Sequence, residues 1–217
     1  MTTATRAPKT KDDYSWDRYT KEYLWEIDHG QNQHGLTFRV QRSRIVNGKL
    51  LFDDPVHENW KEIYHQVNRL QPASVFECGC GGCYHLYNIR TLMPHVEVNG
   101  CDLLQSQIQT AGGEKLQIPA DILARTLVAD FTDPATPAAI GRRFDFVYTQ
   151  AVIMHLSHDK AFQFIKNMMA LSTRHILMIE APAHDFDALA QSTGLTAAFR
   201  RDLQTPYVSN AMLWTRI

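Results

Sequence analysis

The chain has 217 residues, 44% of them hydrophobic and 21% charged, which is typical of one folded domain with room for an extension. Its 22 basic and 23 acidic side chains give a formal net charge of −1, so no global field holds it on a nucleic-acid backbone or an anionic membrane. The longest apolar runs are far shorter than the roughly 20 residues that span a bilayer, so we expect neither a transmembrane helix nor a membrane partner.

The N-terminus and the cysteines indicate the compartment. Residues 1–13 are polar and lack the apolar segment of a secretory signal, so we expect a short disordered leader. All four cysteines fall between positions 78 and 101, whereas a secreted disulfide scaffold would be shorter and would spread its cysteines along the chain. Reduced thiols in a cytoplasmic protein are therefore expected. The sequence does not indicate an oligomeric state.

The chain divides near residue 70, and residues 1–70 are expected to form an N-terminal cap with helices. Residues 14–27 are predicted to be helical, with large side chains on more than one face. Their aromatic side chains are either ordinary core or a lid packed over an active site. In the second interpretation Tyr14, Trp16 and Tyr19 contact a substrate.

Two further elements are expected before residue 72. Residues 37–54 alternate in part between apolar and polar side chains and contain Asn47-Gly48, the strongest short hairpin signal. Residues 59–70 carry apolar side chains at helical spacing, and Pro72 ends that helix.

After Pro72 the pattern becomes regular, because short apolar runs rich in branched residues alternate with amphipathic helical stretches. The expected strands are residues 74–77, 96–103, 126–130, 144–152 and 175–181, and helices are expected at residues 159–171 and 185–191. This alternation predicts a parallel sheet with helices on both faces in a single domain, residues 71–217. Residues 195–203 and 210–217 are two strands with no helix between them, so a terminal antiparallel hairpin closes the sheet.

The first strand after Pro72 ends on Glu77 and runs into a glycine turn, Gly79-Cys80-Gly81-Gly82-Cys83, before a helix begins near Tyr84. Glycines allow a tight turn and a close approach of ligand to backbone, and the helix N-terminus offers free amides. A dinucleotide fingerprint requires a third glycine at position 84, where tyrosine stands.

The segment Glu77-Cys-Gly-Cys-Gly-Gly-Cys83 instead resembles the first motif of the class I S-adenosylmethionine-dependent methyltransferases, with Cys83 in place of the last glycine and Gly82 supplying flexibility one position early. The resemblance covers residues 72–217. It implies a Rossmann-like, mostly parallel seven-stranded sheet. It also implies that S-adenosylmethionine contacts Glu77, Gly79, Cys80 and Gly81.

The same resemblance assigns three later parts of the cofactor site. Asp102, with Leu103 beside it, follows the second strand and holds the ribose hydroxyls, since a carboxylate accepts hydrogen bonds from both. Asp130 and Phe131 follow the third strand and contact adenine, and Gln150 ends the fourth strand near the methionine part. Alternatively, the two aspartates cap the helices that follow their strands.

The cysteines have a second interpretation, as thiolate ligands of a metal. Cys78 and Cys80 lie within one tight turn, however, and no fourth ligand follows at usable spacing. We therefore expect small buried residues beside the cofactor and no metal site.

His155 is the candidate catalytic residue, because it follows the fourth strand at the edge where open α/β sheets bind ligands. Methyl transfer mainly requires alignment, but a hydroxyl acceptor must also lose a proton, which a histidine can take. The alternative is a structural histidine at a helix start. Glu180, at the end of the fifth strand, either orients the substrate or pairs with a basic side chain.

The absence of certain sequence signatures limits the class of methyl acceptor. The fourth strand is not followed by the Asn-Pro-Pro-Tyr or Asp-Pro-Pro-Tyr signature of enzymes that methylate amino groups of bases, and the ends of the fourth and fifth strands lack the cysteine of cytosine enzymes. We therefore expect methyl transfer to an oxygen or nitrogen of a small molecule, such as a sugar or a natural-product intermediate. The alternatives are an RNA or protein methyltransferase, for which Arg39, Arg42, Arg44 and Lys49 form a modest basic cluster, and a non-catalytic cofactor-binding scaffold.

Overall fold

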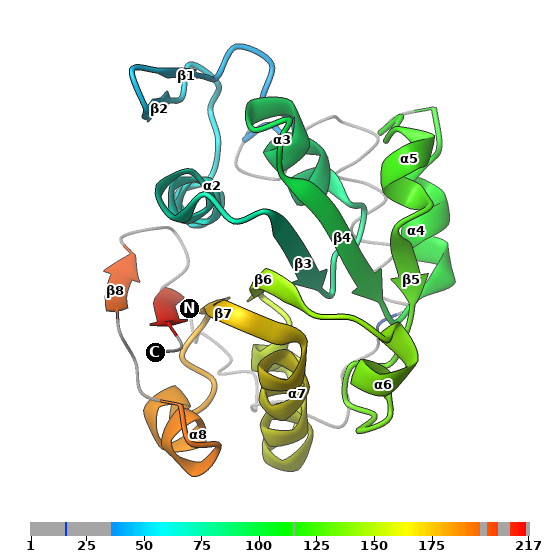
Figure 1. Ribbon diagram of the computed structural model, residues 1–217, viewed down its shortest axis with the longest axis vertical. Helices are drawn as coiled ribbons and strands as arrows, with labels where there is room; N and C mark the ends of the chain where they lie inside the picture. Colours follow the sequence, from blue (N-terminus) through cyan, green and yellow to red (C-terminus); the bar gives the residue numbers. More distant parts are fainter. Residues whose placement is uncertain (1–15, 17–35, 115, 196–198, 204–208, 216–217) are drawn as a thin grey trace, which may run out of the picture.

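The computed structural model describes residue 16 and residues 36–114, 116–195, 199–203 and 209–215. The described part contains a seven-stranded sheet in the order β5-β4-β3-β6-β7-β9-β8 (Figure 1). Pairing is parallel from β5 to β7, whereas β9 runs antiparallel to both β7 and β8. The predicted fold class, a mostly parallel sheet closed by an antiparallel pair, is therefore confirmed.

The strands and helices follow the predicted alternation. The strands of the large sheet are β3 (Ser74–Cys78), β4 (Glu97–Asp102), β5 (Thr126–Val128), β6 (Phe144–Gln150), β7 (Ser172–Glu180), β8 (Phe199–Leu203) and β9 (Ser209–Thr215). The helices between them are α3 (Tyr84–Leu92), α4 (Gln105–Ala111), α5 (Ala120–Leu123), α6 (Thr136–Ile140), the 3₁₀ turn η2 (Ile153–His155), α7 (His158–Leu171) and α8 (Phe186–Ser192). The predicted hairpin of the last two strands is present, and Gly194 takes the positive φ of 84° expected after α8.

Alternate residues of each strand enter different cores, because successive side chains of a strand point to opposite faces. On β3, Val75 packs into a core with α2 and α3, whereas Phe76 packs into a second core with α7 and α8. Helices therefore cover both faces of the sheet, as Figure 1 shows. None of the helices in the described ranges is long and apolar enough to cross a membrane.

The part of the chain before residue 72 contains a small hairpin and a long helix, α2 (Glu58–Leu70). Strands β1 (Arg44–Val46) and β2 (Lys49–Leu51) pair antiparallel around Asn47 and Gly48, whose φ angles are 51° and 75°. Two successive positive φ angles are the geometry that Asn-Gly favours in a two-residue hairpin loop. This prediction is confirmed. The predicted helix at residues 14–27 lies outside the described residues except for Trp16, which is helical.

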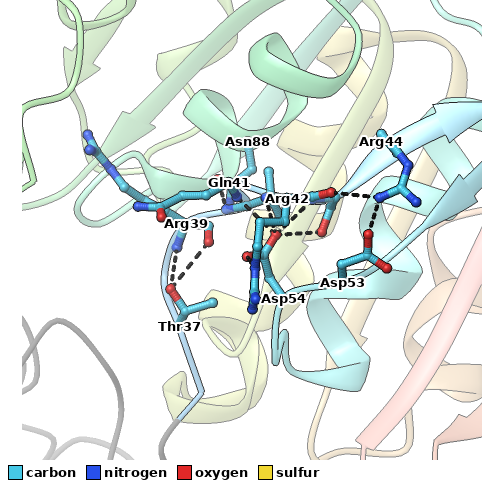
Figure 2. Close-up of polar contacts among 10 residues, drawn as sticks. Thr37, Arg39, Gln41, Arg42, Arg44, Asp53, Asp54 and Asn88 are labelled. Carbon is cyan, nitrogen blue, oxygen red and sulfur yellow. Dashed lines mark hydrogen bonds and ion pairs between the residues drawn. The ribbon is translucent and has the colours of Figure 1, made fainter.

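A buried carboxylate fixes the segment that leads into this hairpin. Asp54 Oδ2 accepts hydrogen bonds from the backbone amides of Gln41, Arg42 and Ser43, each at 2.9 Å, and from Ser43 Oγ at 2.8 Å (Figure 2). We call these four residues the Asp54 cluster. Burial raises the pKa of Asp54, but these hydrogen bonds outweigh it and bring the pKa to about 2.

Asn88 ties the same segment to α3. Its Oδ1 accepts the amide of Val40 at 3.1 Å, and its Nδ2 donates to the carbonyl of Phe38 at 2.9 Å. The side chain of Asn88 thus accepts from one backbone group of this segment and donates to another, as the backbone of a neighbouring strand would. It holds Phe38 over the N-terminal end of α3, where the ring centroids of Phe38 and Tyr84 are 5.3 Å apart.

Candidate active site

A cavity of about 400 Å³ lies at the carboxyl ends of β3 to β7. The sheet order places β3 between β4 and β6, so the chain leaves β3 in one direction and β6 in the other. Open α/β sheets bind their ligands at such a switch point. Every residue assigned to the cofactor lines this one cavity, namely Glu77, Gly79, Cys80, Gly81, Asp102, Leu103, Asp130, Phe131 and Gln150.

The glycine turn packs closely against the loop after β6 and against the end of β4. Gly79 has a φ of 78°, and a Cβ built on it would lie 2.5 Å from Cγ2 of Val152, so only glycine fits. The amides of Gly79 and Cys80 both donate to the carbonyl of Cys101, at 2.8 and 2.9 Å, which folds the turn onto β4. Gly81 also has a positive φ, 50°, and lines the cavity, where its amide donates to Asp102 Oδ2 at 2.8 Å.

Cys83 takes a left-handed backbone conformation, which favours glycine. Its φ and ψ are 59° and 14°, at the N-cap of α3, whereas Gly82 is absent from the residues with positive φ. The expectation that Gly82 supplies the flexibility is therefore wrong, because the residues of the turn with positive φ are Gly79, Gly81 and Cys83. This conformation costs a non-glycine residue about 1 kcal/mol of conformational free energy. The Cys83 sulfur lies 3.8 Å from that of Cys80.

Asp102 faces the turn from the end of β4. Its Oδ2 accepts the amide of Gly81 at 2.8 Å and its Oδ1 accepts the amide of Leu104 at 2.9 Å. Each carboxylate oxygen has a second lone pair, so both remain able to accept a hydroxyl. Burial raises the pKa of Asp102, and the amides of Leu104, Gly81 and Leu103 oppose that rise. Helix capping is excluded as its role, since the N-cap of α4 is Leu104.

Asp130 and Phe131 form the next part of the wall, in the loop after β5. Asp130 Oδ1 accepts the amide of Thr132 at 2.8 Å and its hydroxyl at 2.7 Å, which shapes a local turn and caps no helix. Phe131 is buried, with its ring centroid 4.8 Å from that of Phe164. Asn167 Nδ2 donates to the carbonyl of Phe131 at 2.9 Å and so fixes the loop to α7. An acid beside a rigid ring is suited to an aromatic heterocycle with an amino group.

Glu77 lies at the bottom of the cavity, at 2% exposure. Burial raises its pKa well above the ordinary value, although Tyr148 Oη donates to its Oε2 at 3.1 Å and opposes that rise. The carboxyl group of Glu77 therefore stays protonated to a higher pH than that of a surface glutamate.

The structure gives His155 and Glu180 positions beside the cavity, and neither is among its lining residues. The ring of His155 packs edge-on against Trp16, which does line the cavity, with centroids 5.7 Å apart. Burial lowers the pKa of His155 to about 4. Glu180 is fully buried and accepts the amides of Val152 at 3.2 Å and Met154 at 3.0 Å. It therefore anchors the loop that carries His155.

Of the remaining residues assigned to the substrate, the structure describes only one. Trp16 lines the cavity, whereas Tyr14 and Tyr19 lie outside the described residues. Sequence reasoning missed a group of rings on the other side of the cavity, which we call the aromatic wall: Phe38, His57, Trp60, Tyr84 and His85. The signal for Tyr84 and His85 was available, since they occupy the first turn of the helix that follows the glycine turn. No group of three or more metal-binding side chains is arranged for a metal ion within the described ranges.

Two of the four cations of the basic cluster pair with a carboxylate. Arg44 pairs with Asp53, and Arg42 Nε lies 3.4 Å from Asp54 Oδ1 (Figure 2). Arg39 donates to the carbonyl of Leu116 and lies over the ring of Tyr87, 4.5 Å from its centroid.

No family model and no curated protein matches the sequence. Solved structures do match. The magnesium protoporphyrin IX methyltransferase of Synechocystis PCC 6803, with bound S-adenosylmethionine, aligns with a TM-score of 0.61 and 17% identity over 74% of this chain and 79% of that chain. A putative O-methyltransferase from Nostoc punctiforme PCC 73102 aligns with a TM-score of 0.58 and 13% identity over 72% and 55% of the two chains. Human N-acetylserotonin methyltransferase aligns with a TM-score of 0.55 and 14% identity over 73% and 52%.

Proposed function

Since the chain has the fold of the class I, Rossmann-like methyltransferases, we propose that it is an enzyme that transfers the methyl group of S-adenosylmethionine to an oxygen or nitrogen atom of a small molecule. The single observation that carries this proposal is the convergence of the glycine turn, Asp102 and Asp130 on one cavity.

The residues of this cavity fit the cofactor part by part. Asp102 accepts the two ribose hydroxyls with the lone pairs that its backbone contacts leave free. Phe131 packs against adenine while Asp130 accepts from its amino group, and the glycine turn lines the cavity where the methionine part would lie. Gln150 adjoins that end of the cavity. The cofactor supplies a methyl group bound to a positively charged sulfur.

The task of the chain is to align the acceptor with that methyl group and to exclude water. The assignment of His155 as the base that removes a proton from the acceptor stays a prediction. With a pKa of about 4 the ring is neutral at neutral pH and so can accept a proton, which it would hold only weakly. Trp16, which contacts this ring, lines the cavity, whereas His155 itself is not among the lining residues.

A small acceptor is favoured over RNA because the arginines of the basic cluster are occupied within the chain, by Asp53, by Asp54 and by a backbone carbonyl. A phosphate backbone is held mainly by free cationic side chains. The non-catalytic scaffold stays the second alternative, and transfer of the methyl group from S-adenosylmethionine to an acceptor separates the enzyme from it.

Calorimetric titration with S-adenosylhomocysteine tests the cofactor site. We expect micromolar binding to the wild type and a loss of about 30-fold or more in Asp102→Ala, which removes charge-assisted hydrogen bonds to two hydroxyls. Asp121→Ala is the matched control, since this aspartate is on the surface, 3.8 Å from Arg90 and away from the cavity. Equal affinities in the two variants, or no binding to the wild type, would overturn the proposal.

A further inference from the structure

The aromatic wall includes the buried imidazole of His85. The ring of His85 lies edge-on to Trp60, with centroids 5.4 Å apart, and 4.3 Å from the ring of Tyr84. Trp60 in turn lies 5.0 Å from Tyr84 and 5.8 Å from Phe38, ring centre to ring centre. The wall therefore presents flat, rigid rings on the side of the cavity that is formed by α2, α3 and the segment at Phe38.

A chain of hydrogen bonds fixes where the proton of His85 sits. The amide of Val40 donates to Asn88 Oδ1, which leaves Asn88 Nδ2 as a donor, and that nitrogen lies 2.8 Å from Tyr64 Oη. The hydroxyl of Tyr64 then directs its own proton to His85 Nδ1, at 2.9 Å. With Nδ1 accepting, the neutral imidazole carries its proton on Nε2.

The Nε2 proton of His85 is a buried donor. The side chain is 2% exposed, and Nε2 makes no hydrogen bond of normal geometry within the described part of the chain. Burial lowers the pKa of His85 to about 3, a side-chain hydrogen bond with Gln150 opposes that shift and His57 reinforces it, so the ring is neutral at neutral pH. Because Nδ1 faces Tyr64, Nε2 points away from Tyr64, and its partner Gln150 lines the same cavity as His85. The contact with Gln150 falls short of normal hydrogen-bond geometry, and an incompletely satisfied buried donor costs free energy, which a ligand oxygen that accepts from Nε2 would recover.

The charges of the cavity limit what that ligand is. The described residues that line it include the carboxylic acids Glu77, Asp102 and Asp130 but no lysine or arginine. A phosphorylated or multiply anionic acceptor would have no cationic side chain there to offset its desolvation. A flat, uncharged molecule instead matches both the rings and the neutral donor.

We propose that the methyl acceptor is a planar aromatic compound carrying an uncharged oxygen, a phenol hydroxyl or a ring carbonyl, which accepts a hydrogen bond from Nε2 of His85 while its ring packs on the aromatic wall. This inference rests on the proposed function, which places the cofactor at the Asp102 side and its methyl group toward Gln150. The aromatic wall then lies on the far side of the methyl group from the cofactor, where the acceptor has to bind. This inference limits the acceptor to an aromatic compound and excludes a sugar.

Three probes separate the ring from the oxygen: 2-naphthol, naphthalene, which lacks the oxygen, and decahydro-2-naphthol, which is not flat. Each is titrated into the protein saturated with S-adenosylhomocysteine, and the dissociation constants are compared. For the wild type we expect 2-naphthol to bind about tenfold more tightly than naphthalene and several-fold more tightly than the saturated alcohol. A saturated alcohol that binds as tightly as 2-naphthol contradicts the proposal.

The variants test His85 itself. In His85→Phe the preference for 2-naphthol over naphthalene should fall to about one, because a ring remains and the donor is gone. Tyr64→Phe keeps His85 but frees Nδ1, so the preference should fall in part, and it serves if His85→Phe does not fold. His95→Phe, at an exposed histidine that contacts Gln71, is the matched control and should keep the full preference.

The outcomes distinguish this inference from the proposed function. If His85→Phe weakens S-adenosylhomocysteine by about tenfold and leaves the preference for 2-naphthol intact, His85 serves the cofactor and the inference is overturned. A full preference in both variants overturns it as well. If the wild type fails to bind S-adenosylhomocysteine, the proposed function fails. The probes are then titrated alone, and a preference that depends on His85 still supports an aromatic site.

Discussion

Replacing Asp54 by asparagine is expected to destabilise the fold in a manner that depends on pH. The carboxylate accepts three backbone amides and one hydroxyl on a single oxygen, and its side chain is 6% exposed. An asparagine in the same place offers one acceptor oxygen and an NH₂ group that has to face donors. The variant therefore loses the ionic part of the Asp54 cluster, which holds the segment from Phe38 to the hairpin.

The magnitude follows from the pKa of Asp54. Its pKa is about 2 in the folded protein against an ordinary value of 3.8. Since the folded-state pKa is depressed, the stabilisation is complete above 3.8 and is lost as the pH falls toward 2. At about 1.36 kcal/mol per pKa unit, the contribution is roughly 2.4 kcal/mol at pH 7 and roughly 1.3 kcal/mol at pH 3.

Urea denaturation of the wild type and of Asp54→Asn, from pH 7 to pH 3, measures this difference. The gap in the free energy of unfolding should be about 2 kcal/mol at neutral pH and should narrow by roughly half at pH 3. Asp53→Asn is the adjacent control, because Asp53 is 47% exposed in a surface pair with Arg44 and should cost less than about 1 kcal/mol. A gap for Asp54→Asn that stays constant across this pH range would refute the reasoning.

Three further changes have expected outcomes. Gly79→Ala should lower the free energy of unfolding by about 1–3 kcal/mol and weaken S-adenosylhomocysteine about tenfold, because of the positive φ and the contact with Val152; an unchanged melting temperature and affinity would contradict it. Cys83→Gly should be more stable to urea than Cys83→Ala by about 1 kcal/mol, since both remove the sulfur but only glycine relieves the left-handed conformation; the reverse order would disprove the strain. Glu180 has a pKa raised by burial to about 7 from 4.5, so its contribution is present below 4.5 and lost as the pH rises through 7. The wild type should therefore lose roughly 2–3 kcal/mol relative to Glu180→Gln between pH 5 and pH 8, and parallel stability curves would show otherwise.

The cofactor half of the cavity was predictable from the sequence because it is built on strand ends. Asp102 and Asp130 each follow a branched apolar run, and parallel strands bring their carboxyl ends to one edge of the sheet. The order of these strands in the sequence therefore predicts that the two aspartates lie at the same edge of the sheet. The sequence predicts strand limits less accurately where the residues after a strand are also apolar. The pattern predicts a strand over residues 126–130, whereas β5 ends at Val128 and the following residues form the turn at Asp130.

Local hydrogen bonding explains the assignments that the sequence could not supply. An acid at the end of β7 looks like a substrate ligand in the sequence, but the amides that Glu180 accepts belong to the loop after β6, and nothing in the local pattern brings the two together. The sequence likewise does not show which residues before α3 are left-handed, since two adjacent glycines and a cysteine leave the turn geometry open. The backbone angles assign this conformation to Gly81 and Cys83 and not to Gly82.

The acceptor half resists prediction for a further reason. Its polar group, the Nε2 proton of His85, is directed by a relay through Tyr64 and Asn88 to the amide of Val40, across three parts of the chain far apart in sequence. Each member has an ordinary local role on its own helix or segment. Tyr64 and Asn88 are not among the residues that line the cavity, so substitutions there leave its surface in place while they remove contacts that orient the proton of His85. The proposed aromatic site therefore predicts that Tyr64 and Asn88 variants change the preference among acceptors, and an acceptor screen should include them as well as the variants of the wall.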